Sequence, residues 1–307
     1  MKLLVTGGSG FIGSNLALEL ERLGHNVIVV DNFSTGNRQN LVGFKGELIA
    51  ESILTFDLNK ISDPSRHGTG RDVVAIFHNA AITDTTLKDT EQMIKVNVDG
   101  FKRLLDFAVT HNIKFIYASS AGVYGNAPSP LSETMAGEPI NLYGQSKWQS
   151  DCIAFDYMEQ FKAHIIGLRY FNVFGQREQY KGKMASMIWQ LAQQILQGKR
   201  PRIFKWGDQR RDQVYVKDVV RANILALDAK RNAIVNVGSG CAITFNHIIE
   251  VLNDVLGTKF APDYFDNPYE GLYQNYTQAD LTQAKEVLDY TPVWNFDNAV
   301  RDYFNNR

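Results

Sequence analysis

The sequence predicts an α/β fold, a doubly wound parallel sheet followed by a smaller C-terminal α/β domain. Three observations support this prediction. Apolar strand patterns and helical patterns alternate through the first half of the 307 residues, as in a sheet whose parallel strands are joined by helices. After about residue 170 the elements become shorter. Hydrophobic residues make up 44% of the chain, enough to bury a large core without disulfides or metal.

The expected strands are short apolar runs near residues 2–6, 27–31, 47–50, 73–78, 114–119 and 164–169. Helical periodicity between them predicts helices that include residues 12–23, 91–109 and 143–161. Gly24 is expected to end the first helix, because glycine adopts positive φ without strain. In the C-terminal part we expect a strand at 202–206 and helices near residues 184–197, 216–227, 245–256 and 281–288.

The domain boundary is expected near residue 170, with a sheet domain at residues 1–170 and a mainly substrate-binding domain at residues 171–307. The second domain is expected to lie over the carboxyl edge of the sheet, where open α/β sheets bind their ligands. The stretch near residues 214–240 is a candidate for return to the first domain, because Val235-Asn236-Val237 has the pattern of a buried strand.

Charge and cysteine content exclude several classes of protein. The 32 lysine and arginine residues balance 33 aspartate and glutamate residues, so no global field recruits nucleic acid or an anionic membrane. Cys152 and Cys241 have no metal-type spacing, and we expect reduced thiols and no metal site. The first residues already form a strand, and no stretch reaches about eighteen apolar residues. These features predict a soluble cytoplasmic protein.

The amino terminus carries the pattern of a dinucleotide-binding turn. The first strand runs into Gly7, Gly10 and Gly13. Gly7 permits the tight turn, Gly10 lets backbone amides approach a pyrophosphate, and Gly13 lets the helix pack close to the sheet. The next strand ends in Asp31, whose carboxylate can accept hydrogen bonds from an adenosine ribose. This order of features predicts a Rossmann-type domain that holds a nucleotide cofactor.

A second pattern, Tyr143-x-x-x-Lys147, can turn a tyrosine hydroxyl into a general base. Residues four apart on a helix share one face, so the two side chains can meet. Lowering a tyrosine pKa from about 10 to about 7 requires roughly 4 kcal/mol of preferential stabilisation of the phenolate. Lys147 and an oxidised nicotinamide ring can supply this together in a desolvated cleft. Ser120, or its neighbour Ser119, is expected to hydrogen-bond the reacting hydroxyl.

The two patterns together resemble the extended short-chain dehydrogenase/reductases, which combine a G-x-x-G-x-x-G turn with a Y-x-x-x-K pair. Residues 77–81 also resemble the segment that runs under the cofactor in this superfamily, and Asn97 matches the helix asparagine that supports the active-site backbone. His78 is interpreted as a structural histidine at a buried strand end. The resemblance implies a set of cofactor-binding residues: Gly7, Gly10, Phe11, Ile12, Gly13, Asp31, Asn32, Arg38, Asn79, Ala80, Ala81, Asn97, Tyr143 and Lys147.

The residues after Ser120 separate two kinds of enzyme within this superfamily. Dehydratases place an Asp-Glu pair there, whereas this chain has Ala121 and Gly122, neither of which can move a proton. The stretch 117–125 instead resembles the epimerases, in which the cofactor removes a hydride and later returns it to the other face of the carbon. The resemblance therefore implies an isomerase without net redox change.

Residues 169–186 and 276–282 are similar to the ADP-glycero-manno-heptose 6-epimerases, and the similarity spans nearly the whole chain. In those enzymes the lysine of an Arg-Glu-x-x-Lys segment is a second base opposite the tyrosine, and it falls on Lys181 here. Two bases suit the oxidation of an exocyclic carbinol at C6 to a ketone and its reduction with inverted configuration. The resemblance thus implies that Tyr143, Lys147, Ser120 and Lys181 are the catalytic residues.

The same resemblance implies where the nucleotide sugar binds. Lys183 and Gln190 depart from the pattern, because enterobacterial-type sequences carry a serine and a histidine there. In the basic stretch 199–211, aromatic side chains can flank a base, and an arginine can donate two parallel hydrogen bonds to a diphosphate. The expected substrate-binding residues are Thr83, Ser120, Asn172, Lys183, Gln190, Phe204, Arg211 and Tyr273.

The sequence leaves two alternatives open, one for the cofactor and one for the function. Asp31 favours NAD, because a carboxylate beside the ribose repels a 2′-phosphate, whereas Arg38 can neutralise that phosphate, and the resemblance favours NADP. The loop 31–38 also resembles the UDP-hexose 4-epimerases, which are the alternative function. A non-catalytic dinucleotide sensor is less favoured, since the chain retains the catalytic groups. The resemblance further implies a homo-oligomer joined through helices near residues 91–110 and 143–161.

Overall fold

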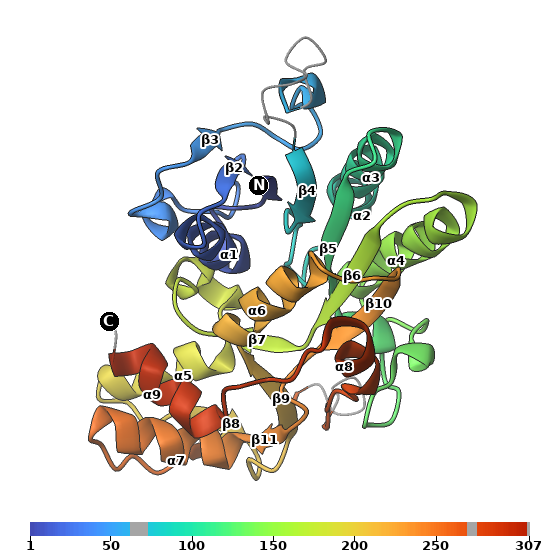
Figure 1. Ribbon diagram of the computed structural model, residues 1–307. Helices are drawn as coiled ribbons and strands as arrows, with labels where there is room; N and C mark the ends of the chain where they lie inside the picture. The colour runs from blue at the N-terminus through green and yellow to red at the C-terminus, as the bar shows by residue number, and fades with distance from the viewer. Residues whose placement is uncertain (62–72, 269–274, 306–307) are drawn as a thin grey trace.

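A seven-stranded parallel sheet forms the centre of the computed structural model, which describes residues 1–61, 73–268 and 275–305 (Figure 1). Its strand order is β10-β6-β5-β4-β1-β2-β3, and every neighbouring pair is parallel. The strands are β1 Lys2–Thr6, β2 Asn26–Val30, β3 Glu47–Ile49, β4 Val73–His78, β5 Lys114–Ser120, β6 Ile165–Tyr170 and β10 Ala233–Val237. All six strands expected in the first half are therefore confirmed, and the α/β fold class with them.

The strand order reverses direction between β1 and β4. Starting from β1, the chain adds β2 and β3 on one side and then returns to add β4, β5 and β6 on the other. In open α/β sheets the carboxyl ends of the strands on either side of such a reversal border the ligand crevice. The fold therefore places the site where the glycine turn after β1 meets the residues after β4.

Strand β10 pairs with β6, with Val235 opposite Leu168. β10, which comes from the stretch near residues 214–240, therefore belongs to the large sheet. The division of the chain into two domains at residue 170 stays a prediction.

Helices cover both faces of the sheet. On one face α1 Phe11–Arg22 and α6 Val216–Ala226 pack on a core that includes Leu16, Leu20 and Val219, and α8 Thr282–Leu288 lies against β10. On the other face α3 Gly100–Thr110 and α4 Leu142–Gln160 pack on a second core that includes Phe101 and Leu104. Gly24 has φ +84° just past α1, as expected.

The helix expected at 91–109 is interrupted. It consists of α2 Thr90–Ile94, a π-helical turn Lys95–Asp99 and α3. The π turn carries the buried Asn97, whose amide binds backbone groups of the loop after β4. One extra residue in a turn changes the apolar period too little to be seen in the sequence.

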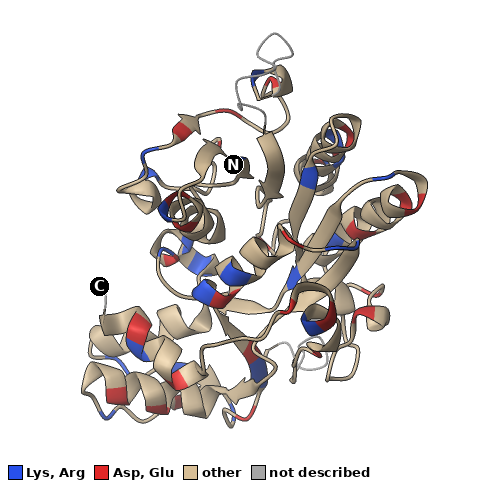
Figure 2. Cartoon of the chain, viewed as in Figure 1, with Lys and Arg blue, Asp and Glu red and all other residues tan. Residues whose placement is uncertain are grey.

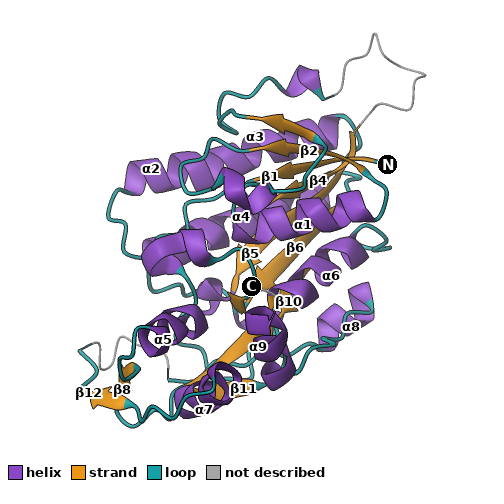
Figure 3. Ribbon diagram, turned by 90° about the vertical axis from the view of Figure 1, so that its left-hand side faces the viewer, coloured by secondary structure: helices purple, strands orange, loops and turns teal. Residues whose placement is uncertain are grey.

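A second group of elements gathers at one end of the sheet (Figure 3). It contains a three-stranded sheet of β11 Ala242–Thr244, β9 Arg210–Tyr215 and β7 Asn172–Phe174, and a pair of β8 Arg202–Phe204 with β12 Asp263–Phe265. Three helices pack on a third core there: α5 Met187–Leu196, α7 Phe245–Leu256 and α9 Phe296–Asn305. The strand expected at 202–206 ends at Phe204, and β7, β9, β11, β12 and α9 were not predicted.

Short 3-10 turns complete the described chain, at Arg38–Leu41, Leu58–Lys60, Ala121–Tyr124, Glu133–Met135 and Gln179–Met184. Positive and negative residues are interspersed along the elements (Figure 2), and the net charge is −1. In the described part of the chain, no helix is long and apolar enough to cross a membrane.

Candidate active site

The glycine turn between β1 and α1 has the close backbone approaches that the sequence predicts. Gly7 has φ +65°, and a Cβ on it would lie 2.7 Å from the amide nitrogen of Ala80. A Cβ on Gly13 would lie 2.2 Å from the carbonyl oxygen of Gly7, so no side chain fits there. Gly10 caps α1 without a side-chain hydrogen bond. The backbone amides at the N-terminus of α1 therefore have no side-chain cap. Together with the positive end of the helix dipole, they form an environment that suits a pyrophosphate.

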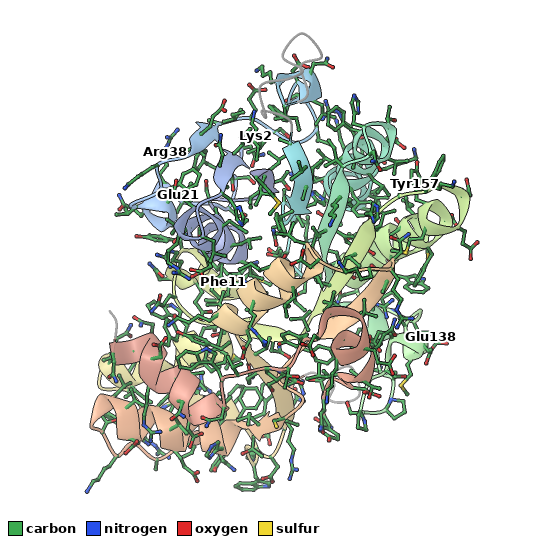
Figure 4. The ribbon with its side chains drawn as sticks, viewed as in Figure 1. Lys2, Phe11, Glu21, Arg38, Glu138 and Tyr157 are labelled. Carbon is green, nitrogen blue, oxygen red and sulfur yellow. The ribbon has the colours of Figure 1, made fainter. Side chains whose placement is uncertain are left out.

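Asp31 ends β2 beside this turn and is only 7% exposed. Its carboxylate accepts hydrogen bonds from the amides of Ser9, at 2.9 Å, and Phe33, at 2.7 Å. Burial raises the pKa of Asp31, and these two hydrogen bonds oppose the rise. Asn32 is exposed, and the guanidinium carbon of Arg38, labelled in Figure 4, lies 4.5 Å from the Phe33 ring centroid. A carboxylate and a cation thus flank the same loop.

Asn79, Ala80 and Ala81 follow β4 and are half-buried against the glycine turn. The amide of Ala80 donates to the hydroxyl of Thr6 at 3.3 Å. Among the described residues, the buried Oδ1 of Asn79 and Oγ of Ser9 have no hydrogen-bond partner. These unpaired atoms, together with the uncapped helix, fit a polar ligand such as a dinucleotide lying over the turn.

His78 and Asn97 support this region from below. The Nδ1 of His78 lies 2.8 Å from the Thr6 hydroxyl, and burial lowers the pKa of His78 to about 3, so the ring is neutral and structural as predicted. Asn97 accepts a hydrogen bond from the amide of Ile82 at 2.7 Å and donates to its carbonyl at 2.9 Å and to Ser146 at 3.0 Å. Asn97 therefore holds the loop after β4 against α4, as the resemblance implies.

Ser120, Tyr143 and Lys147 meet at the carboxyl end of β5. Asn141 caps α4 by accepting from the amide of Gly144 at 2.8 Å, which places Tyr143 in the first turn. The Nζ of Lys147 lies 6.0 Å from the Tyr143 ring centroid and donates to the carbonyl of Ala118 at 2.7 Å. The structure thus brings three of the four predicted catalytic residues together.

The electrostatics of this group oppose ionisation of the tyrosine in the protein alone. Burial raises the pKa of Tyr143, and its hydrogen bond with Ser120 opposes the rise. Burial also lowers the pKa of Lys147 to about 8, which weakens the positive charge that would stabilise a phenolate. Lowering the Tyr143 pKa therefore requires a further positive charge in the cleft, in line with the expected oxidised nicotinamide.

Lys181 reaches the glycine turn from the loop between β7 and α5. Its Nζ lies 5.4 Å from the ring centroid of Phe11, the first residue of α1, which is labelled in Figure 4. Burial lowers the pKa of Lys181. An amine held here in a desolvated place, with a lowered pKa, suits proton transfer better than an exposed lysine does.

Some predicted substrate-binding residues also border this loop. Lys183 forms an ion pair with Asp84 at 2.9 Å and donates to Thr86 at 3.1 Å, which joins the loop to the segment containing the half-buried Thr83. Gln190 donates to the carbonyls of Ala185, at 2.7 Å, and Lys183, at 3.3 Å. The amide of Gln190 therefore stabilises the loop backbone.

The remaining substrate-binding predictions lie on other elements. Asn172 is exposed at the start of β7, and Arg211 is 8% exposed in β9, where its Nη1 donates to the carbonyl of Arg210. Phe204 belongs to β8 and packs on Phe265, with 4.9 Å between the ring centroids. Tyr273 lies outside the described residues.

Sequence reasoning missed a buried ion pair directly behind the catalytic group. Asp151 and Arg169 are 0% and 1% exposed, with 2.9 Å between Oδ2 and Nε. The hydroxyl of Tyr117 donates to Asp151 at 2.8 Å, and Nη1 of Arg169 donates to the carbonyl of Glu133 at 2.8 Å. One signal was available: Asp151 follows Lys147 by four residues and so shares its helix face.

A dinucleotide-binding turn and a Ser-Tyr-Lys group lie at one edge of the parallel sheet. Together they suit the oxidation and reduction of a carbinol by a bound nicotinamide. The fold and this site define an extended short-chain dehydrogenase/reductase. The chain belongs to the NAD dependent epimerase/dehydratase family, whose sequence profile matches residues 3–238.

Similarity to individual epimerases extends over nearly the whole chain. An ADP-L-glycero-D-manno-heptose-6-epimerase from Alkalilimnicola ehrlichii is 36% identical, covering 98% of this chain and 96% of the relative. The crystal structure of the Helicobacter pylori ADP-L-glycero-D-manno-heptose-6-epimerase is 37% identical, with a TM-score of 0.88 over 99% of this chain and 95% of that one. A UDP-N-acetylglucosamine 4-epimerase from Methanobrevibacter ruminantium is 29% identical, with a TM-score of 0.90 over 99% and 97%. The prediction of a nucleotide-sugar epimerase with an NAD-type dinucleotide is confirmed at this level.

Proposed function

We propose that this chain epimerises C6 of an ADP-linked glycero-manno-heptose. The observation that carries the proposal is the position of Lys181, half-buried beside Phe11 at the glycine turn, where burial lowers its pKa. A second proton carrier there is what inversion by two bases requires, and a one-base 4-epimerase has no need of it. The 36–37% identity to heptose epimerases over nearly the full chain supports the same substrate class.

The residues of this chain divide the work between them. A nicotinamide dinucleotide held over the turn of Gly7, Gly10 and Gly13 would supply reversible hydride transfer at the carbinol carbon. Tyr143 and Lys181 exchange protons with the sugar oxygen, one for each face of the carbon. Ser120 directs the oxygen through its hydrogen bond, and Lys147 holds positive charge beside Tyr143.

Substrate recognition is proposed to draw on both groups of elements. Arg211 is assigned to the diphosphate, since a guanidinium matches two phosphate oxygens in one plane. Phe204 is assigned to the nucleobase and Asn172 to the sugar. Thr83, Lys183, Gln190 and Tyr273 remain assigned to the substrate side of the site as the resemblance implies.

Incubation of the purified protein with ADP-glycero-manno-heptose, UDP-galactose and UDP-N-acetylglucosamine, followed by NMR, tests this function. We expect inversion at C6 of the heptose and no change in either UDP sugar. The second candidate is a UDP-hexose 4-epimerase, favoured by the structural likeness to the 4-epimerase with a TM-score of 0.90. Turnover of a UDP sugar with none of the heptose would establish that candidate instead.

We further propose NADP as the preferred cofactor, with Arg38 as the residue that accepts the 2′-phosphate. Both oxygens of Asp31 already receive backbone amides, so its charge is partly balanced. Replacing Arg38 by Ala is expected to weaken NADPH binding by roughly tenfold, the effect of losing one charge-assisted hydrogen bond, and to leave NADH binding nearly unchanged. Fluorescence titration of the apoprotein with each nucleotide measures both dissociation constants.

The matched control for this titration is Arg22→Ala, because Arg22 lies at the far end of α1 in an exposed pair with Glu19. It should alter neither dissociation constant. An Arg38→Ala protein that keeps the wild-type ratio of the two constants would contradict the assignment. The predicted homo-oligomer and cytoplasmic location stay predictions.

A further inference from the structure

The loop that carries Lys181 is closed by a buried carboxylate. We define the Lys181 loop as residues 175–186. Glu178, which is 0% exposed, accepts hydrogen bonds on Oε1 from the amide of Gly175 at 3.0 Å and the hydroxyl of Ser186 at 2.9 Å. Its Oε2 accepts from the amide of Ser186 at 2.6 Å. One side chain therefore binds the first and the last residue of the loop.

The closed loop is also fastened to the cofactor-binding half of the chain. The Nδ2 of Asn15, on α1, donates to the carbonyl of Gln176 at 2.9 Å. Arg177 donates through Nη1 to Oδ1 of Asn15 at 3.0 Å and through Nε to the carbonyl of Asn40 at 3.1 Å. The two residues before Glu178 thus tie the Lys181 loop to α1 and to the segment after β2.

The electrostatic environment of Lys181 also indicates a role for Glu178. Desolvation disfavours the ammonium form of Lys181, and among the described residues Glu178 is the one charged group whose field opposes this. The packed neighbour from α1 is the uncharged ring of Phe11. The other lysine of the loop, Lys183, is 68% exposed and is paired with Asp84.

We propose that Glu178 is the positioning residue of Lys181: its buried carboxylate closes the loop, and its negative charge favours the ammonium form of the amine. The proposal rests on the proposed role of Lys181 in proton transfer. Glu178 touches neither substrate nor cofactor in this role, and it acts through the loop backbone and through its charge.

The test is Glu178→Gln in the cofactor-loaded enzyme with ADP-glycero-manno-heptose. The amide has the size of the carboxylate, but it lacks the charge and presents an NH₂ group to donors that need an acceptor. We expect kcat to fall by roughly 10- to 100-fold, and the limb of the pH–rate profile that reports Lys181 to move to lower pH by about one unit. The direction follows because loss of a negative neighbour destabilises the ammonium form.

Ser186→Ala is the matched control, because it removes a hydrogen bond to Glu178 and a helix cap while the charge stays. It should lower kcat without moving the limb. Titration of ¹³C-lysine resonances, assigned by their loss in Lys181→Met, follows the amine directly and should show the same downward shift in Glu178→Gln. An unchanged Lys181 titration in the folded Glu178→Gln protein would overturn the proposal.

If Glu178→Gln does not fold, Glu178→Asp, which keeps the negative charge, tests the proposal instead. Glu178→Asp shortens the side chain by one methylene, so it should lower kcat and leave the limb in place. A Glu178→Asp enzyme with wild-type kcat would overturn the proposal. Failure of the proposed function is distinguishable, because the wild-type enzyme and Lys181→Met would then both epimerise a UDP sugar and leave the heptose unchanged, whatever the Glu178 variants do.

Discussion

Tyr143→Phe and Lys181→Met should each lower the rate of heptose epimerisation by on the order of 10² to 10⁴, the range for losing a positioned general acid or base. Tyr143 lies beside Ser120 and Lys147, and Lys181 lies beside the glycine turn, so each loss removes the proton carrier for one face of the carbon. The measurement is the initial rate on ADP-glycero-manno-heptose by NMR, with cofactor occupancy checked by absorbance. Binding of the sugar nucleotide should survive in both variants.

Controls for this pair come from the same chemical types away from the site. Tyr157→Phe alters the opposite end of α4, labelled in Figure 4, where the hydroxyl donates to Asp106. Lys60→Met alters an exposed pair with Glu51. Both should epimerise at the wild-type rate. A 4-epimerase with one base would lose nearly all activity in Tyr143→Phe and little in Lys181→Met. That result would favour the alternative function, a UDP-hexose 4-epimerase.

Arg169→Met should lower the free energy of unfolding by about 3–5 kcal/mol, the usual cost of leaving a buried charge without its partner. Asp151 is completely buried, and the loss of Arg169 removes its only ion pair among the described residues. Urea unfolding followed by circular dichroism gives the free energy of each protein. The loss also removes the hydrogen bond from Arg169 to the carbonyl of Glu133, so the segment after β5 should loosen as well.

Two further proteins make this result interpretable. Arg22→Met removes an equivalent pair at the surface, and we expect little change in stability because water screens it. Asp151→Leu combined with Arg169→Met removes both charges and should recover part of the loss. Equal stability of Arg169→Met and Arg22→Met would show that the buried pair contributes nothing.

The sequence predicts the large sheet well because its signals are local. Strands such as residues 27–30 are apolar on both faces, and Gly7, Gly10 and Gly13 have a spacing typical of the dinucleotide-binding turn. The small sheets could not be predicted in the same way. Strands β7, β11 and β12, which were not predicted, have three residues each, too few for a period, and their partners lie far along the chain.

In the candidate site, too, local contacts could be predicted from the sequence and contacts between distant residues could not. Tyr143 and Lys147 are neighbours on one helix face, so spacing alone brings them together. Asp151 on α4 forms an ion pair with Arg169 on β6, and no sequence pattern predicts that these two side chains are partners. The same holds for Glu178, whose partners Gly175 and Ser186 are known only once the loop is folded.

The contacts of Arg177 make the Lys181 loop and the dinucleotide turn parts of one thermodynamic linkage. The guanidinium binds α1 at Asn15 and the segment after β2 at Asn40, the two elements that we predict to flank the adenosine half of the cofactor. Whatever free energy a bound dinucleotide gains from an ordered loop, the loop gains equally from the dinucleotide. Under the proposed roles, we therefore expect binding of the dinucleotide and ordering of the Lys181 loop to be coupled, so that release of the dinucleotide loosens the loop that carries Lys181.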